Sequence, residues 1–155
     1  MTTEIERKFL VADAPGADVL GPGTRLRQGY LAEDGAVQVR VRISDGSAVL
    51  TVKAGRGLSR TEVEVAIDAG EAEALWPHTE GRRVEKVRHR TPVGGGLVAD
   101  VDVYEGNLEG LCTVEVEFAS EGAARAFRPP AWFGRDVTEA AGWDNASLAR
   151  HGRPA

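Results

Sequence analysis

The feature that most limits the fold of this chain is an alternation of charged and apolar residues that returns along most of its length. In the first such segment, Glu4, Glu6 and Lys8 alternate with Ile5 and Phe9. Successive side chains of a β-strand point to opposite faces, so the charged side chains share one face and stand about 7 Å apart. The alternation therefore predicts strands with one charged face and one apolar face.

This pattern predicts eight short strands, separated by turn signals such as Asp34-Gly35 and Asp45-Gly46. The strands are expected at 3–11, 25–32, 36–44, 47–54, 60–67, 83–91, 97–104 and 112–119. Helices are expected at 70–76, 120–127 and 145–151. Short strands joined by tight turns, with no linker between them, predict one mostly antiparallel α+β domain that spans residues 1–155.

The charged positions have the same parity within each strand. They are Glu4, Glu6 and Lys8; Arg25 and Arg27; Arg40 and Arg42; Thr51 and Lys53; Arg60, Glu62 and Glu64; Lys86, Arg88 and Arg90; Asp100 and Asp102; and Thr113, Glu115 and Glu117. For any one strand, a solvated sheet face is a sufficient interpretation. Taken together, the like-charged pairs favour a closed sheet in which both signs converge. An eight-stranded barrel has an interior just wide enough for side chains or one small ligand, so we predict a closed β-barrel tunnel with a polar, charged lumen and a few flanking helices.

Charge and composition exclude several classes of function. The net charge of −5 argues against nucleic acid as the main partner, because a basic surface normally supplies that affinity. No run approaches 18 apolar residues, so no membrane-spanning helix is expected. The single cysteine, Cys112, cannot form an internal disulfide, and the first residues lack a secretory signal, so we expect a cytoplasmic protein.

The charged parity suits a phosphorylated ligand. Arg and Lys bind phosphate through charge-assisted hydrogen bonds. Carboxylates in the same site would repel phosphate, which implies a hard cation, Mg²⁺ or Mn²⁺, between the carboxylates and the phosphate oxygens. A local basic cleft can attract such an anion in spite of the negative overall charge.

These residues resemble the CYTH superfamily, the triphosphate tunnel metalloenzymes, over almost the whole chain. The family hallmark E-x-E-x-K matches Glu4, Glu6 and Lys8. The further matches are R-x-R at Arg40 and Arg42, T-x-K at Thr51 and Lys53, E-x-E at Glu62 and Glu64, K-x-R at Lys86 and Arg88, an aspartate at Asp102, and E-x-E at Glu115 and Glu117. The chain departs from the family at Trp143, where a tyrosine is usual, and at His89, where an aromatic residue is common. Its short length and the stretch Gln28-Gly29-Tyr30-Leu31 resemble most the small bacterial members that hydrolyse inorganic tripolyphosphate.

The resemblance implies a role for each charged pair. It implies phosphate binding by Lys8, Arg40, Arg42, Lys53, Lys86, Arg88 and Arg60. It implies that Glu4, Glu6, Glu115 and Glu117 hold one or two Mg²⁺ or Mn²⁺ ions. It also implies that Glu62, Glu64 and Asp102 bind metal through water or orient the arginines. Tyr30 and Lys86 match a tyrosine–lysine pair that prepares the attacking water in relatives, although Tyr30 is also compatible with a packing role.

Other functions of the same tunnel stay open at this point. Adenylate cyclase activity of the class IV type would use the same lumen on ATP, and hydrolysis of thiamine triphosphate or a nucleoside triphosphate would need only a different substrate. A non-catalytic polyphosphate-binding module is a further alternative, although binding alone would favour an all-basic lumen. The three tryptophans, Trp76, Trp132 and Trp143, are expected to pack over the outer wall of the barrel.

Overall fold

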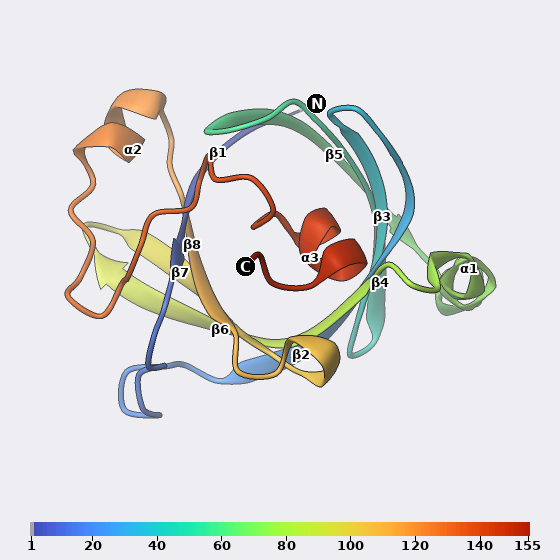
Figure 1. Ribbon diagram of the computed structural model, residues 1–155, viewed down its shortest axis with the longest axis horizontal. Coiled ribbons are helices and arrows are strands. Elements are labelled where there is room, and N and C mark those ends of the chain that lie inside the picture. Colours follow the sequence, from blue (N-terminus) through green and yellow to red (C-terminus); the bar gives the residue numbers. More distant parts are fainter. Residues whose placement is uncertain (1) are drawn as a thin grey trace.

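Eight antiparallel strands close into a β-barrel in the computed structural model, which describes residues 2–155 (Figure 1). The strands are β1 (Thr2–Leu10), β2 (Gly23–Asp34), β3 (Val37–Ser44), β4 (Ser47–Ala54), β5 (Ser59–Ile67), β6 (Arg83–Gly94), β7 (Leu97–Tyr104) and β8 (Cys112–Glu117). Around the barrel their order is β1-β5-β4-β3-β2-β6-β7-β8. The closed, mostly antiparallel barrel predicted from the alternation is confirmed, and all eight predicted strands are present.

Short helices cover the barrel, and the first begins with a full set of capping bonds. The helices are α1 (Ala69–Leu75), α2 (Glu121–Ala126) and α3 (Asn145–His151), with short 3₁₀ helices η1 (Trp76–Thr79) and η2 (Gly106–Leu108). At α1, Asp68 accepts a hydrogen bond from the backbone of Glu71, whose side chain accepts one from the backbone of Asp68. Such a reciprocal pair satisfies two N–H groups at a helix start and fixes where the helix begins.

The main apolar core lies outside the barrel, between its wall and the segment that carries α2. Val101, Val114 and Val116 are fully buried on the outer faces of β7 and β8. Phe9 of β1 packs against Phe133, with ring centroids 5.0 Å apart. Because the apolar side chains of each strand are buried on the outside of the barrel, the charged side chains that alternate with them must face the lumen.

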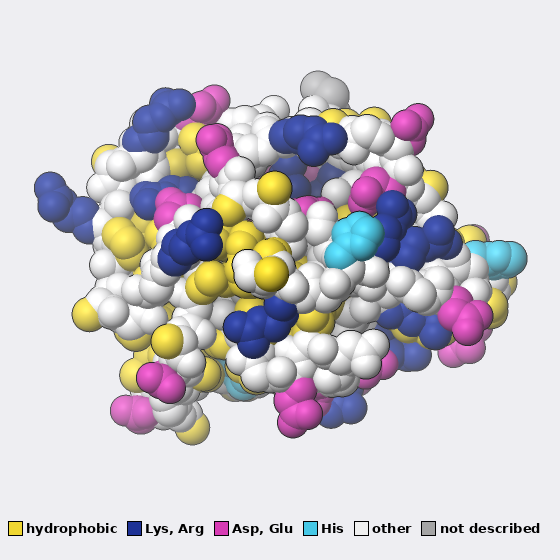
Figure 2. Space-filling model, viewed as in Figure 1, with side chains coloured by type: hydrophobic (Ala, Val, Ile, Leu, Met, Phe, Trp, Pro, Cys, Tyr) yellow, Lys and Arg dark blue, Asp and Glu magenta, His cyan; other side chains and the backbone are white. Residues whose placement is uncertain are grey.

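The last helix, α3, lies at one end of the barrel. Figure 1 shows α3 within the outline of the barrel, and its contacts are with β2 and β6. Trp143, just before α3, is buried at 8% exposure in a cluster with Tyr30, Tyr104 and Leu148. The prediction that Trp143 packs on the outer wall is therefore wrong, because α3 turns its apolar side into the end of the barrel. Figure 2 shows this end filled across its centre.

The parity assigned to strand β2 from sequence is also wrong. Arg27 lies opposite Ile43 and Arg25 lies opposite Val87, so both arginines are on the outer face. The Arg27 guanidinium lies over the Trp76 ring, 5.0 Å from its centroid, an arrangement that stabilises a cation at a surface. The lumen face of β2 instead carries less polar residues. No helix among residues 2–155 has the length and apolar character needed to cross a membrane.

Candidate active site

Charged side chains from most strands line the lumen, and many directly opposed neighbours on adjacent strands carry opposite charge. The oppositely charged pairs are Glu4 and Arg60, Lys8 and Glu115, Lys53 and Glu62, Arg88 and Asp102, and Arg90 and Asp100, whereas Glu6 with Glu117 and Asp100 with Glu115 are like-charged. Residues directly opposite on one sheet face stand about 5 Å apart at their Cβ atoms, so opposite charges attract. This pairing explains how a barrel can enclose many ions whose burial would otherwise be strongly unfavourable.

The acidic side of the lumen lies on β1 and β5. Lys53 Nζ lies 3.4 Å from Glu4 Oε2 and 3.3 Å from Glu62 Oε2, and Arg60 donates a 2.7 Å hydrogen bond to Glu6. Burial raises the pKa of Glu4 to about 8, and its hydrogen bond with Glu62 and the charge of Glu6 add to the rise. The charge of Lys53 therefore does not offset burial and the neighbouring carboxylates, and the ionised form of Glu4 is disfavoured without a further cation.

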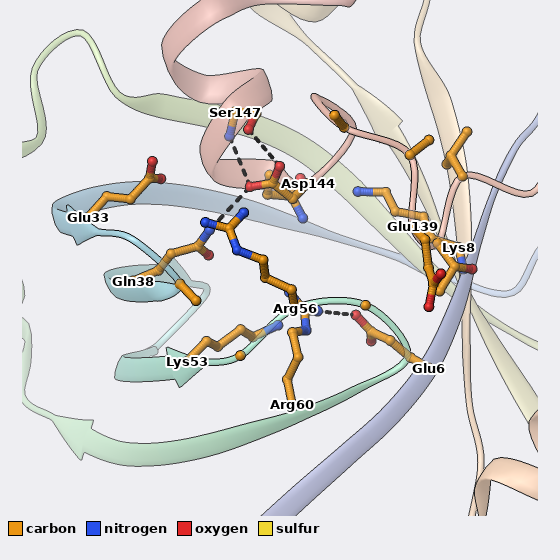
Figure 3. A pocket seen from close by; sticks show the side chains of 18 of the residues that line it. Glu6, Lys8, Glu33, Gln38, Lys53, Arg56, Arg60, Glu139, Asp144 and Ser147 are labelled. Carbon is orange, nitrogen blue, oxygen red and sulfur yellow. Dashed lines mark hydrogen bonds and ion pairs between the residues drawn. The ribbon is translucent and has the colours of Figure 1, made fainter.

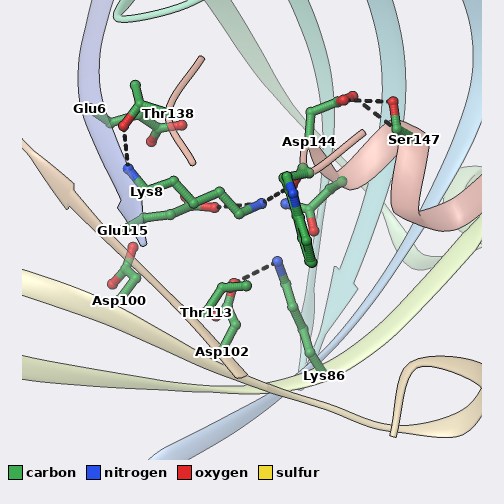
Figure 4. A network of polar contacts seen from close by, with 12 residues as sticks. Glu6, Lys8, Lys86, Asp100, Asp102, Thr113, Glu115, Thr138, Asp144 and Ser147 are labelled. Carbon is green, nitrogen blue, oxygen red and sulfur yellow. Dashed lines mark hydrogen bonds and ion pairs between the residues drawn. The ribbon is translucent and has the colours of Figure 1, made fainter. Parts of the chain in front are cut away.

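A buried cluster on β6 and β7 joins Lys86, Arg88 and Asp102, and Figure 4 shows the contact between Lys86 and Asp102. Asp102 Oδ2 lies 2.7 Å from Lys86 Nζ, and the Arg88 guanidinium donates to both carboxylate oxygens at 2.8 and 2.9 Å. The side chains of Lys86 and Asp102 have no exposed surface. Burial lowers the pKa of Lys86 to about 8 against the opposing effect of Asp102. The charges of Arg88 and Lys86 hold the pKa of Asp102 below its usual value, although burial alone would raise it.

The basic side of the lumen includes two arginines of β3. Arg40 is 6% exposed and donates to Thr51 Oγ1 at 3.3 Å, and no carboxylate of the described residues lies within ion-pair distance of it. Burial and then the charges of Arg40 and Arg88 lower the pKa of Arg42. Guanidinium groups that repel one another in this way create a site that an anion would stabilise.

A cavity of about 290 Å³ opens from the lumen at the end where α3 lies (Figure 3). This volume is at the small end of the range for small-molecule sites, about 300–1,000 Å³. Of the residues singled out from the sequence, those that line it are Glu6, Lys8, Tyr30, Arg40, Lys53, Arg60 and Glu115. The cavity thus brings together phosphate-binding and acidic candidates from five strands.

The C-terminal segment forms one wall of this cavity. Lys8 Nζ donates a 2.7 Å hydrogen bond to the carbonyl oxygen of Trp143 and lies 3.6 Å from Glu115 Oε1. Asp144, the N-cap of α3, accepts from the backbone and hydroxyl of Ser147 and from Gln38 Nε2. Lys8, predicted as a phosphate ligand, therefore also attaches the C-terminal segment to the barrel.

The other candidates lie beyond the cavity, along the lumen. They are Glu4, Arg42, Glu62, Glu64, Lys86, Arg88, Asp102 and Glu117. Of these, Glu117 lies opposite Glu6 in the register but is exposed, and the side chain of Glu64 is 41% exposed. Asp102 has both oxygens engaged by Lys86 and Arg88, which fits a role in orienting those cations.

The strand register does not place Tyr30 opposite Lys86, whose partner on β2 is Leu26. Tyr30 lies opposite Arg40 on the lumen face and is 4% exposed, but no hydrogen bond joins it to Lys86. The aromatic ring beside Lys86 is that of Tyr104, its direct neighbour on β7, at 5.4 Å from the ring centroid to Nζ. Tyr104 donates its hydroxyl to Asn145 Oδ1 at 2.7 Å, and so it helps to hold α3.

The cavity also contains residues that the sequence did not single out. Arg56 lines it from the turn between β4 and β5, and Glu33, Gln38, Glu139 and Asp144 line it from other segments. Arg56 stands between two glycines with positive φ, Gly55 at 105° and Gly57 at 77°. This Gly-Arg-Gly stretch is the one signal in the sequence that could have indicated a turn presenting a cation.

The acidic residues have the chemistry that a hard divalent cation needs. Within residues 2–155, no three acidic, histidine or cysteine side chains already surround one point in a way that would hold a metal ion. Mg²⁺, however, usually keeps several waters and binds through one or two carboxylates together with substrate phosphates. Burial and the charge of Glu115 raise the pKa of Glu6, so a cation beside these two carboxylates would be stabilised. The donor set therefore fits Mg²⁺ or Mn²⁺ bound together with a phosphorylated ligand.

Comparison with known proteins identifies the family. The CYTH domain model matches residues 2–141. The chain belongs to the CYTH family. An inorganic triphosphatase of Nitrosomonas europaea is 47% identical to this CYTH protein over 148 residues, which is 95% of this chain and 97% of the relative. An inorganic triphosphatase of Acetivibrio thermocellus is 36% identical, over 97% of this chain and 96% of the relative. A crystal structure of the inorganic triphosphatase NE1496 superposes with a TM-score of 0.72 at 43% identity and covers 99% of both chains.

Proposed function

We propose that this protein hydrolyses inorganic tripolyphosphate to pyrophosphate and phosphate inside the barrel. The observation that carries the proposal is the charge distribution of the closed lumen. Arg40 on β3 lacks a carboxylate partner, while Glu4 and Glu6 on β1 have raised pKa values. Such a lumen needs both an anion and a cation to complete its charge balance. The high identity to relatives named inorganic triphosphatase, over nearly their full length, supports the same substrate.

In this proposal the basic residues hold the substrate. Arg40 and Arg42 of β3 anchor the phosphoryl groups, because charge-assisted hydrogen bonds from guanidinium to phosphate are strong and directional. Lys8, Lys53, Arg60, Lys86 and Arg88 exchange part of their contact with carboxylates for contact with phosphate oxygens. A bound Mg²⁺ or Mn²⁺ ion, held by Glu4, Glu6 and Glu115 with Glu117 at the rim, would supply positive charge at the transferring phosphoryl group.

The chemical step is an in-line displacement. The oxygen of a water molecule attacks the terminal phosphorus, the bond from that phosphorus to the bridging oxygen breaks, and pyrophosphate leaves with the electron pair. The water loses one proton in this step. Burial lowers the pKa of Lys86 to about 8, so the neutral fraction of its amine, a minority near neutral pH, can receive that proton. Tyr30, on the lumen face, would direct the water if the loaded lumen brings the two side chains together.

An assay with several substrates tests the proposal. Purified protein is incubated with tripolyphosphate, ATP or thiamine triphosphate, with Mg²⁺, with Mn²⁺ or with a chelator, and phosphate and cyclic AMP are measured. Release of phosphate mainly from tripolyphosphate, and only with metal, is the expected result. Cyclic AMP formed from ATP would identify a cyclase. Faster phosphate release from ATP or thiamine triphosphate than from tripolyphosphate would identify that compound as the preferred substrate. Binding of tripolyphosphate without turnover would indicate a polyphosphate-binding module.

Matched arginine variants connect this activity to the lumen. Arg40→Met should raise KM for tripolyphosphate at least tenfold, because it removes a lumen cation that no carboxylate neutralises. Arg25→Met removes an arginine of the outer face, where it pairs with Glu105 at 3.0 Å, and should leave turnover unchanged. Equal effects of the two variants would contradict substrate binding in the lumen.

A further inference from the structure

Gln28 of β2 carries a buried polar group with no partner. The residue is 1% exposed, and neither Nε2 nor Oε1 has a hydrogen-bond partner among the described residues. Buried amide groups in folded proteins are almost always paired, and leaving one unpaired is destabilising. A carboxamide kept in such a place needs a partner that is neither a side chain nor the backbone of this chain.

The strand register puts Gln28 on the lumen face of β2. It lies directly opposite Arg42 on β3 and opposite Val84 on β6, with Tyr30 next on the same face of β2. Lys86 is the next lumen residue of β6 after Val84, and it lies opposite Leu26. Gln28 is therefore flanked by the proposed phosphate-binding residues of β3 and by the strand that carries Lys86.

The packing outside β2 fixes this orientation. A Cβ atom added at Gly29 would lie 2.5 Å from Cβ and Oγ1 of Thr79, so η1 packs directly on the backbone at this point. Thr79 is fully buried and donates to the Trp76 carbonyl oxygen at 2.7 Å, which holds it in place. With β2 fixed from outside, the side chains of Gln28 and Tyr30 have only the lumen to point into.

The chemistry of a carboxamide selects the kind of partner. The oxygens of a triphosphate only accept hydrogen bonds, so they can satisfy Nε2 but not Oε1. A water molecule and a phosphoryl group that lie side by side satisfy both atoms together. The water donates a hydrogen bond to Oε1, and Nε2 donates one to an oxygen of the phosphoryl group. An extended triphosphate anchored by Arg40 and Arg42 would place a phosphoryl group beside Gln28.

We propose that Gln28 orients the attacking water, an inference that rests on the proposed triphosphatase function. Oε1 accepts one hydrogen of the water and so directs an oxygen lone pair at the terminal phosphorus, while Nε2 holds a non-bridging oxygen of the same phosphoryl group. The carboxamide takes no proton, because the proton lost by the water leaves through the base of the reaction. Orientation of this type lowers the barrier of the chemical step more than it strengthens substrate binding.

Gln28→Met tests the inference, because methionine has a similar length and offers neither a strong donor nor a strong acceptor. We expect kcat for tripolyphosphate to fall at least tenfold, KM to change less than threefold, and the thermal midpoint to stay equal or rise, since an unpaired polar group has been removed. Thr91→Val is the matched control. Thr91 is 1% exposed and its hydroxyl is also unpaired, but it lies on β6 with the outward parity, opposite Ala99. Thr91→Val should therefore leave kcat for tripolyphosphate unchanged.

The outcomes separate the two proposals. If wild type releases phosphate from tripolyphosphate and Gln28→Met lowers kcat less than tenfold, or alters only KM, Gln28 does not orient the water although the function stands. If wild type releases no phosphate, the proposed function fails and this inference fails with it. Should Gln28→Met not fold, Gln28→Asn decides by the same thresholds, because it keeps the amide but withdraws it from the lumen by one methylene group.

Discussion

Asp102→Asn is the substitution whose effect can be worked out most fully from the structure. Asp102 is completely buried and is the shared counter-charge of Lys86 and Arg88, at 2.7 to 2.9 Å. Asparagine has nearly the same shape, so the substitution removes the charge without leaving a cavity. Two cations then remain in the lumen without their main counter-charge.

The expected loss of stability follows from measurements on similar pairs. Removing one partner of a buried ion pair is typically destabilising by about 3–5 kcal/mol. For a domain of this size each kcal/mol lowers the thermal midpoint by about 2–4 °C, so we expect a fall of roughly 10 °C. The control is Asp100→Asn on the same face of β7, whose carboxylate is half-buried and lies at longer distances, 3.4 Å from Arg88 and 3.6 Å from Arg90. Partly exposed pairs contribute about 0–1 kcal/mol, so this variant should lose less than about 4 °C.

The loss should also depend on pH and on substrate. Lys86 has a pKa of about 8 in the wild type, below its unfolded value, and without Asp102 that pKa falls further. The unfolded chain then binds more protons than the folded variant over a wider pH range than in the wild type. The loss of unfolding free energy caused by Asp102→Asn should therefore grow as pH falls below about 8. Tripolyphosphate added with a chelator should restore part of the midpoint, because it supplies the missing negative charge. Thermal unfolding followed by circular dichroism measures all of this. An Asp102→Asn midpoint no lower than that of Asp100→Asn would refute a buried counter-charge at this position.

Three further substitutions test other parts of the structure. Glu115→Gln should raise the Mg²⁺ concentration needed for half-maximal tripolyphosphatase activity at least tenfold, whereas Glu121→Gln on the outer helix α2 should not; an unchanged Mg²⁺ titration for Glu115→Gln would remove it from the metal site. Asp144→Ala removes the N-cap of α3 and its bond from Gln38, so it should lower the free energy of unfolding by about 1 kcal/mol in urea titrations, and no change would contradict the capping role. Hydrogen bonds from Thr138 and the charge of Arg7 keep the pKa of Asp136 below its usual value despite burial, so its stabilisation is present above the unfolded pKa of about 3.9 and is lost as pH falls through the folded value. Asp136→Asn should therefore show a smaller loss of unfolding free energy between pH 5 and pH 2 than wild type, and parallel curves would contradict this linkage.

The sequence predicted the barrel well because each strand shows its two faces locally. The alternation around Val39, Arg40 and Val41 indicates which residues share a face of the strand, and the short turns predict that strands adjacent in sequence pair with each other. The strand ends were less accurate: β6 extends to Gly94 and β8 ends at Glu117. Such ends depend on pairing with neighbours, and the residues themselves do not reveal it.

The errors came from relations between distant segments. Charge alone suggested that Arg25 and Arg27 face the lumen, but Trp76 offers Arg27 a partner on the outside. The helix predicted at 145–151 is present, yet nothing local indicates that Trp143, just before it, is buried at the end of the barrel and not on the outer wall. In the same way, the contact of Lys86 with Tyr104 follows from the register of β6 and β7, which spacing along the chain does not contain.

The position of the chain's last residues affects how the protein can be handled. Pro154 packs against Gly142, where an added Cβ atom would lie 2.9 Å from Pro154 Cγ, so the tail folds back beside α3 (Figure 1). Any affinity tag joined after Ala155 would begin beside α3, at the end of the barrel where the 290 Å³ cavity lies. A polyhistidine tag there would bring its own metal-binding groups close to that cavity and distort metal titrations. Purification tags for quantitative work therefore belong at the other terminus or should be cleaved.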